Sequence, residues 1–85
     1  MFIDPERDGC IIILFDGRIQ RLRGNPEDCV KKIMKFIFKI DYNENEAVQT
    51  IIPILDCNAM GRIYKDIFER NRIKYTPLKI EEFIK

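Results

Sequence analysis

The 85-residue chain contains no histidine and no tryptophan. Histidine is the commonest general acid or base in enzymes and the commonest metal ligand, so its absence removes the usual centre of both kinds of site. The three cysteines, Cys10, Cys29 and Cys57, include no Cys-x-x-Cys pair, and a zinc site would need all three brought together by the fold with a carboxylate. We therefore expect no metal site and no cofactor.

The chain also lacks an excess of charge, a long apolar run and a secretory leader. Its net charge is +1, whereas a small nucleic-acid-binding domain usually has a clear basic excess. No apolar run approaches the roughly 18 residues that span a bilayer, and the first residues do not resemble a signal peptide. An odd number of separated cysteines fits free thiols in a reducing compartment. We expect a cytoplasmic protein that binds no membrane, with nucleic acid a disfavoured partner.

The residues that are present indicate a single globular domain over 1–85. Hydrophobic residues make up 46% of the chain and charged residues 34%, which is ordinary for a folded protein and too apolar for disorder. A chain of this length buries about 60–65% of its unfolded surface, so it can fold alone with little margin. The many Lys and Glu side chains also fit a thermophilic source.

The first part of the chain predicts a β-hairpin. We expect a short strand over 1–3, a polar loop over 4–9 and a buried central strand over 10–15. The dipeptide Asp16-Gly17 is typical of a two-residue type I′ turn, so residues 18–23 should return antiparallel. Asn25 and Pro26 then predict the start of a helix that runs to about Ile40.

The second part predicts strands alternating with helices. Residues 41–46 read as a loop and 50–55 as a buried strand, with Pro53 at an edge or bulge. A helix kinked at Pro53 is the alternative for this segment. The remaining predictions are a helix from 56–58 to about Asn71, a strand over 73–75, and a last helix capped by Thr76-Pro77. The sequence thus favours an α/β fold, with α+β open: a small mixed sheet in which an N-terminal β-hairpin precedes α-β-α-β-α, with the helices packed on the sheet.

The first candidate site is the loop that joins a predicted strand to the next helix. Cys57 would lie at the helix N-terminus, where the helix dipole favours the nucleophilic thiolate. Asn58, Gly61 and Arg62 would then supply the amides and the charge that hold an anion. Asp56 opposes this chemistry, and the Cys-x4-Arg spacing is common by chance. The favoured alternative is structural: Cys57 or Asn58 caps the helix, and Gly61 allows close packing.

The second candidate is an interaction surface on the first predicted helix. Its apolar arc covers about 200°, twice what a surface helix needs. Phe36 and Phe38 differ by about 200° around the helix axis, so one core can hardly bury both. We predict that Phe36, Phe38 and Cys29 contribute to a self-association surface. The alternative is a helix buried between the sheet and the last helix, with no partner.

The third candidate is a basic group for nucleic-acid contact. Three arginines follow the predicted turn, and four lysines share one helix face: Arg18, Arg21, Arg23, Lys31, Lys32, Lys35 and Lys39. Such a surface could follow a phosphate backbone, but strand alternation separates Arg18 from Arg21, and four lysines on one face are usually a solvated surface.

Taken together, these patterns favour a non-catalytic interaction or regulatory module over an enzyme. We expect it to be a homodimer or a subunit of a complex, with itself or another protein as partner. The alternatives are a thiol-dependent enzyme or anion-binding protein at Cys57, and weak sequence-independent binding of nucleic acid.

Overall fold

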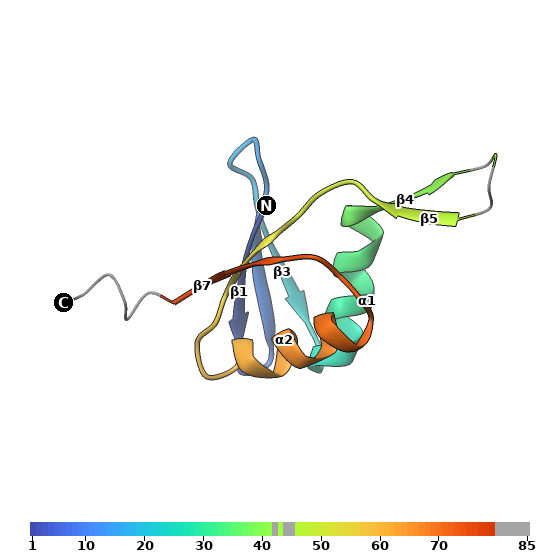
Figure 1. Ribbon diagram of the computed structural model, residues 1–85. Helices are drawn as coiled ribbons and strands as arrows, with labels where there is room; N and C mark the ends of the chain where they lie inside the picture. The colour runs from blue at the N-terminus through green and yellow to red at the C-terminus, as the bar shows by residue number, and fades with distance from the viewer. Residues whose placement is uncertain (42, 44–45, 80–85) are drawn as a thin grey trace.

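The computed structural model describes residues 1–41, 43 and 46–79 (Figure 1). Five strands form one mixed sheet in the order β3-β2-β1-β6-β7, and β4 pairs with β5 in a separate two-stranded sheet. The elements are β1 Phe2–Glu6, β2 Gly9–Ile13, β3 Ile19–Arg23, α1 Pro26–Ile37, β4 Phe38–Asp41, β5 Glu46–Gln49, β6 Ile54–Asp56, α2 Gly61–Arg70 and β7 Thr76–Leu78. The predicted small mixed sheet with helices packed on it is confirmed, and the arrangement fits the α+β alternative.

The first three strands form an antiparallel meander. β1 pairs with β2 over its whole length, so the loop predicted for 4–9 is wrong apart from the turn at Arg7 and Asp8. Pro5 lacks the N–H that a β-ladder needs, so the sequence disfavours a strand at this position. β6 pairs with β1 only at Phe2 and Ile3, so Pro5 lies beyond that second ladder.

The hairpin of β2 and β3 is confirmed, but its turn is longer than predicted. Ile13 pairs with Ile19, and the N–H of Leu14 donates to the carbonyl of Arg18 at 2.9 Å. Three residues therefore form the loop, with Gly17 at φ 85° in the left-handed region that glycine tolerates. The strand is half buried rather than wholly buried, because its side chains alternate between the two faces of the sheet.

Helix α1 begins as predicted and ends early. The Oδ1 of Asn25 accepts a hydrogen bond from the N–H of Asp28 at 2.8 Å, and Pro26 occupies the first turn. The helix ends at Ile37 rather than near Ile40, because the next residues pair with β5 as strand β4. Aromatic and β-branched residues in this segment suit a strand as well as a helix.

The segment predicted as a buried strand over 50–55 is mostly irregular. Only its last two residues, Ile54 and Leu55, belong to a strand, β6, and the alternative kinked helix is also wrong. Pro53 is buried just before β6, and its carbonyl accepts the N–H of Thr76 at 2.8 Å. Pro53 therefore accepts a backbone hydrogen bond at the start of the strand, at a position that needs no N–H donor.

The final helix and strand are also displaced from their predicted places. Helix α2 begins at Gly61, after an irregular segment, and ends at Arg70. The strand predicted over 73–75 is found at Thr76–Leu78, where it pairs parallel with β6, so Thr76-Pro77 does not cap a helix. The remainder of the predicted last helix, 80–85, lies outside the described residues.

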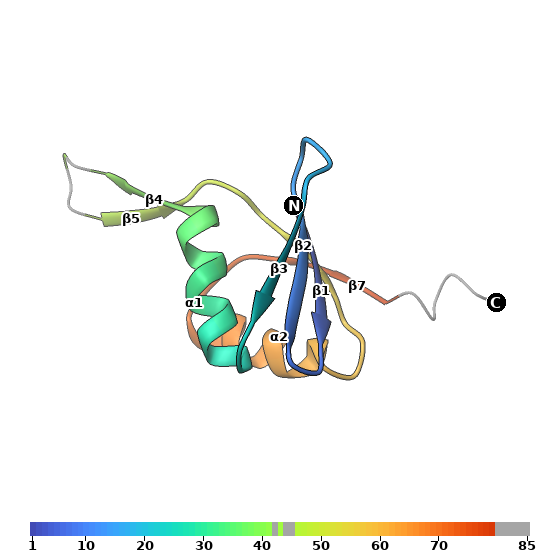
Figure 2. The same cartoon turned by 180° about the vertical axis from the view of Figure 1, so that it is seen from behind.

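The core lies between one face of the five-stranded sheet and the two helices. Helix α1 contacts β2 and β3, α2 contacts β1 and β6, and the helices contact each other. Figures 1 and 2 show α1 and α2 together beside the sheet. The fully buried side chains include Ile3, Ile12, Ile33, Ile37, Leu55, Tyr64 and Phe68. We call the opposite face of the sheet, which neither helix covers, the uncovered face.

No helix in the described ranges is long and apolar enough to cross a membrane.

Candidate functional site

The loop after β6 places Cys57 away from the helix N-terminus. The N–H of Cys57 donates to the carbonyl of Leu78 at 2.8 Å, which extends the ladder between β6 and β7. Its half-buried thiol lies 3.6 Å from the carbonyl oxygen of Leu55. Helix α2 starts only at Gly61, so the thiol does not lie in the first turn, where the helix dipole acts.

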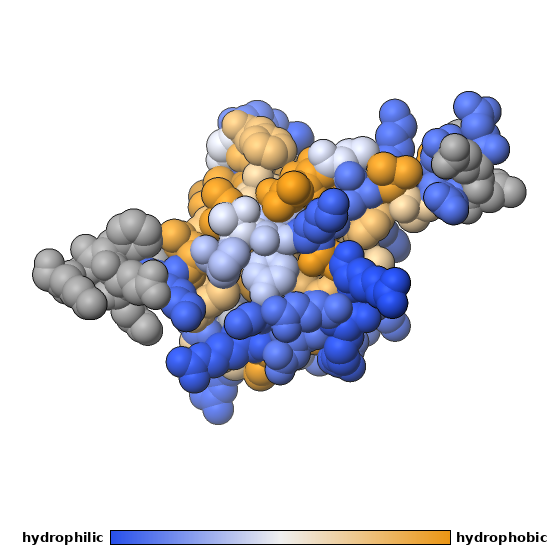
Figure 3. All heavy atoms as spheres, in the orientation of Figure 1, coloured by the Kyte–Doolittle hydropathy of each residue, from blue (hydrophilic) through white to orange (hydrophobic). Residues whose placement is uncertain are grey.

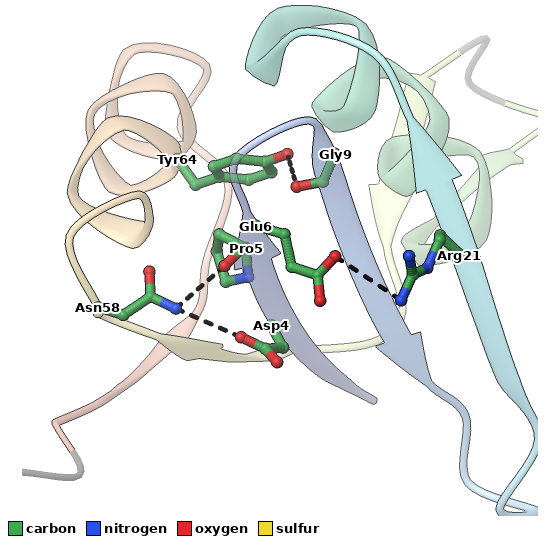
Figure 4. Close-up of polar contacts among 7 residues, drawn as sticks. All are labelled: Asp4, Pro5, Glu6, Gly9, Arg21, Asn58 and Tyr64. Atoms are coloured by element: carbon green, nitrogen blue, oxygen red, sulfur yellow. Dashed lines mark hydrogen bonds and ion pairs between the residues drawn. The ribbon is translucent and has the colours of Figure 1, made fainter.

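The other residues predicted at this loop have structural contacts. Asn58 accepts the N–H of Gly61 at 2.7 Å and donates to the carbonyl of Pro5 at 3.0 Å and to Asp4 at 3.3 Å (Figure 4). A Cβ on Gly61 would lie 2.1 Å from the carbonyl oxygen of Asp56. In the structural alternative, Cys57 or Asn58 caps the helix and Gly61 allows close packing. The close packing of Gly61 is present, but neither residue is the N-cap, which is Met60 with no side-chain cap; Asn58 instead accepts a hydrogen bond from the N–H of the first helical residue. The side chain of Arg62 is exposed.

The other two cysteines belong to the core. Cys10 and Cys29 are fully buried beside Tyr64, whose hydroxyl donates to the carbonyl of Gly9 at 3.2 Å (Figure 4). Burial, and secondarily the neighbouring Cys29, raises the pKa of the Cys10 thiol to about 12. Burial also raises the pKa of Tyr64, with Cys29 the next cause. Both groups are therefore neutral near pH 7.

We expect Cys57 to be the only cysteine that is alkylated rapidly in the native protein. Its thiol is partly accessible, whereas Cys10 and Cys29 become accessible only when the core opens. Their native alkylation should be on the order of 100-fold slower than that of Cys57 at neutral pH. Timed alkylation read by mass spectrometry, with the urea-unfolded chain as control, checks this. Equal native rates for Cys10 and Cys57 would contradict the buried position of Cys10.

The residues predicted for a helical interaction surface lie at three different depths. Phe36 is 37% exposed, Phe38 is half buried against the core, and Cys29 is fully buried. Because the helix ends at Ile37, Phe38 leaves the helical arc and enters β4 instead. Of the three, only Phe36 offers substantial surface to a partner.

The predicted basic group is divided between the two sides of the sheet. Arg21 and Arg23 point to the uncovered face, because Leu22 between them is buried under the helices. The four lysines belong to α1 and β4, and α1 packs on the opposite face. Arg18 pairs with Asp16 at the hairpin loop. The Nζ of Lys32 donates to the carbonyl oxygen of Arg23 at 3.2 Å, so the two groups meet where β3 leads into α1, while the guanidinium groups of Arg21 and Arg23 lie on the other side of the sheet.

The uncovered face carries a row of apolar side chains that the sequence analysis missed. Ile19 pairs with Ile13, Ile13 with Phe2, and Phe2 with Ile54, so the four residues lie side by side across four strands. Three of them are well exposed: Ile19 at 70%, Ile54 at 40% and Ile13 at 37%. We call these four residues the apolar row. The sequence signal for this row is the alternation of side chains along β1 and β2. Once both segments are recognised as strands that helices cover on one face, every second residue must lie on the other face.

More apolar surface adjoins the apolar row at the same end of the sheet. Phe15, in the β2–β3 loop, is 79% exposed, and Ile52, before β6, is 56% exposed. Figure 3 shows apolar side chains interspersed with hydrophilic ones over the upper part of the molecule, and mostly hydrophilic side chains over the lower part, where α2 lies.

A second row of the uncovered face is charged. Two residues along from the apolar row, the register places Arg21, Ile11 and Asp4 side by side. We call these three residues the polar row together with Asp56, which follows Leu55 in β6, influences Asp4 and is only 7% exposed. Burial, then Asp56, then Glu6 raises the pKa of Asp4 above its ordinary value, so the acids repel one another. Arg21 lies 3.8 Å from Glu6 (Figure 4). Within the described residues, no group of three or more Cys, Asp and Glu side chains is placed to hold a metal ion.

No family model, curated protein or solved structure matches the chain.

Proposed function

We propose that the chain is a non-catalytic protein-interaction module that binds another protein chain through the uncovered face. The observation that carries the proposal is the apolar row, a continuous line of large apolar side chains on a sheet face that neither helix of the described residues covers. Contiguous apolar surface of this kind mostly marks an interface in folded proteins. Isolated exposed apolar residues would not support the same conclusion.

Simple energetics favours a covered state of this face. Burial of apolar surface contributes about 25 cal/mol for each Å² that leaves water, so a few large side chains contribute several kcal/mol. The residues of a sheet are already ordered by their ladders, and their burial costs little further backbone entropy. A rigid apolar row therefore supplies binding energy efficiently.

The contacts of the Cys57 loop also support a binding role over an enzymatic one. The side chain of Asn58 is engaged at both ends, and Gly61 packs against the backbone of Asp56. The three free thiols further suit a reducing compartment, and we propose a cytoplasmic location.

The proposal predicts that the hydrophobic dye anilinonaphthalene sulfonate binds the dilute protein mainly at the uncovered face. We expect Ile54→Lys to remove at least about half of the dye fluorescence, because a charge interrupts the apolar row. The matched control is Ile63→Lys on α2, since Ile63 is 45% exposed and Ile54 is 40% exposed. Both variants should unfold at the wild-type temperature within a few degrees.

Two outcomes would contradict this proposal. Equal losses of dye fluorescence in Ile54→Lys and Ile63→Lys would show that the uncovered face has no special affinity for apolar ligands. A larger loss in Phe36→Asp than in Ile54→Lys would place the binding surface on α1, as the sequence analysis predicted.

A further inference from the structure

We infer that the partner of the uncovered face is a second copy of this chain, stacked face to face about a two-fold axis parallel to the strands. This inference rests on the proposed function and names its partner. The axis would pass between β1 and β2, so that each copy presents the same surface to the other. Two sheets packed in this way lie about 10 Å apart, which leaves room for one interdigitated layer of side chains.

The pairing register makes the uncovered face self-complementary about this axis. The rotation places β3 of one copy over β6 of the other, and β2 over β1, because the sheet order is β3-β2-β1-β6. In the apolar row, Ile19 then lies over Ile54 and Ile13 lies over Phe2. Each apolar side chain therefore meets an apolar side chain.

The same rotation gives the acids of the polar row an opposite charge. Arg21 of one copy is carried over β6 of the other, beside the half-buried Asp4 of β1, and the relation is reciprocal. Asp4, whose negative charge is disfavoured in a single chain by the neighbouring acids, then gains a guanidinium as its partner. The side chain of Arg21 is 55% exposed, and at 3.8 Å its contact with Glu6 is too long for a direct hydrogen bond (Figure 4). It is therefore free to turn towards a second copy.

The alternative two-fold axis, perpendicular to the strands, gives a poorer match. It reverses the order of the rows along the strands, so the end of the face that carries Glu6 and Arg23 would cover the apolar row. Charged side chains would then lose water without gaining partners, which costs free energy. Complementarity of charge and of apolar surface selects the parallel axis.

The size of the face suits a weak dimer. The axis between β1 and β2 superposes four strands and leaves β7 without a counterpart, so the overlap is about 19 Å wide at the usual strand spacing of about 4.8 Å. With about 15 Å of strand length, the footprint is roughly 300 Å² on each copy, which lies in the range of weak, transient interfaces. We therefore expect a dimer whose population rises only at high protein concentration.

The test is an exchange of charge between two variants, followed by sedimentation equilibrium. Arg21→Glu places an acid beside Asp4 across the interface, and Asp4→Lys places two cations together, so each variant alone should dimerise at least about tenfold more weakly than wild type. An equimolar mixture should recover dimers of near wild-type affinity. In the mixed dimer, Glu at 21 faces Lys at 4, and the unchanged Arg21 of one chain faces the unchanged Asp4 of the other.

A purely intramolecular role of Arg21 cannot produce recovery on mixing, because its pair with Glu6 stays within one chain. Absence of recovery, with both variants folded by circular dichroism, would overturn the inference. If Asp4→Lys fails to fold, Ile19→Lys replaces it: this change should weaken the dimer at least about tenfold, while Ile40→Lys on β4 should have no effect. Ile19 and Ile40 are 70% and 61% exposed, which makes them a matched pair.

The failure of this inference is distinguishable from failure of the proposed function. A wild-type chain that stays monomeric up to millimolar concentration, but loses dye binding in Ile54→Lys, refutes the homodimer and leaves the uncovered face as a site for a different protein. A dimer that is weakened by Phe36→Asp and unaffected by Ile19→Lys would also refute the face-to-face arrangement. If Ile19→Lys weakens the dimer, and mixing Arg21→Glu with Asp4→Lys restores dimerisation, the result supports both the proposed function and the homodimer.

Discussion

Replacement of Gly61 by alanine is expected to lower the free energy of unfolding by about 3 kcal/mol. The new Cβ would lie 2.1 Å from the carbonyl oxygen of Asp56 and 3.0 Å from its carbonyl carbon. The obstacle is the backbone of β6, which cannot rotate away as a flexible side chain can. A domain of this size is stable by roughly 5–15 kcal/mol, so the change should remove a large part of its stability.

The matched control for this substitution is Gly17→Ala in the β2–β3 loop. An added Cβ there meets no atom within 4 Å, so only the left-handed backbone, at φ 85°, opposes the change. That conformation costs an alanine about 1 kcal/mol. Urea unfolding followed by circular dichroism should rank wild type above Gly17→Ala and Gly17→Ala above Gly61→Ala. A Gly61→Ala protein as stable as Gly17→Ala would show that the loop and β6 are not in close contact.

This result also separates the two interpretations of the Cys57 loop. If Gly61 served an anion site, alanine would reduce anion binding and leave the folded chain intact. If Gly61 permits the close approach of α2 to β6, alanine should destabilise the whole fold with no anion present. The contact with Asp56 favours the second interpretation.

The second large effect is expected at Phe68, where replacement by alanine should cost about 3–5 kcal/mol. Phe68 is fully buried in the face of α2 that packs on the sheet, and its ring lies 5.6 Å from that of Tyr75 between centroids. Truncation loses the buried ring, leaves a cavity and removes this aromatic contact. A small core of this kind has little stability to spare, so the variant should be partly unfolded at 37 °C.

The control is Ile63→Ala on the same helix. Ile63 is 45% exposed, so its truncation should cost less than about 1 kcal/mol while altering helix propensity only slightly. Thermal unfolding by circular dichroism compares the two variants directly. Similar melting temperatures for Phe68→Ala and Ile63→Ala would mean that α2 does not pack on the sheet through Phe68.

The sequence predicted well those elements that strong local signals define. Asn25 and Pro26 marked the start of α1 because a side-chain cap and a fixed φ act within one helical turn. The hairpin of β2 and β3 was predicted from Asp16-Gly17, but the length of its loop and the burial of β2 were misjudged. In the second helix, the helical period predicts that Met60, Ile63, Tyr64, Ile67 and Phe68 face the core. Tyr64, Ile67 and Phe68 are buried, but Ile63 is 45% exposed, so the prediction for Ile63 is wrong.

Predictions failed where short strands depend on distant partners. No local sequence signal distinguishes Phe38–Asp41 from the last turn of a helix. Its pairing with β5 determines that this segment is a strand. β6 has three residues and pairs with β1 and β7, both remote in sequence, while β7 contains a proline that suggested a helix cap. Local propensity is weak for segments of three or four residues, so tertiary pairing determines their structure.

For this protein, the sequence alone determined the small mixed fold, the capped start of α1 and the expectation of a binding role based on excess apolar surface. Only the tertiary structure decided where that surface lies. The predicted arc around Phe36 and Phe38 is divided when the chain leaves α1 for β4, whereas Ile19, Ile13, Phe2 and Ile54 come together across four strands. The physical reason is that a helix face is set by a period of 3.6 residues within one segment, while a row on a sheet is set by the register between strands far apart in sequence.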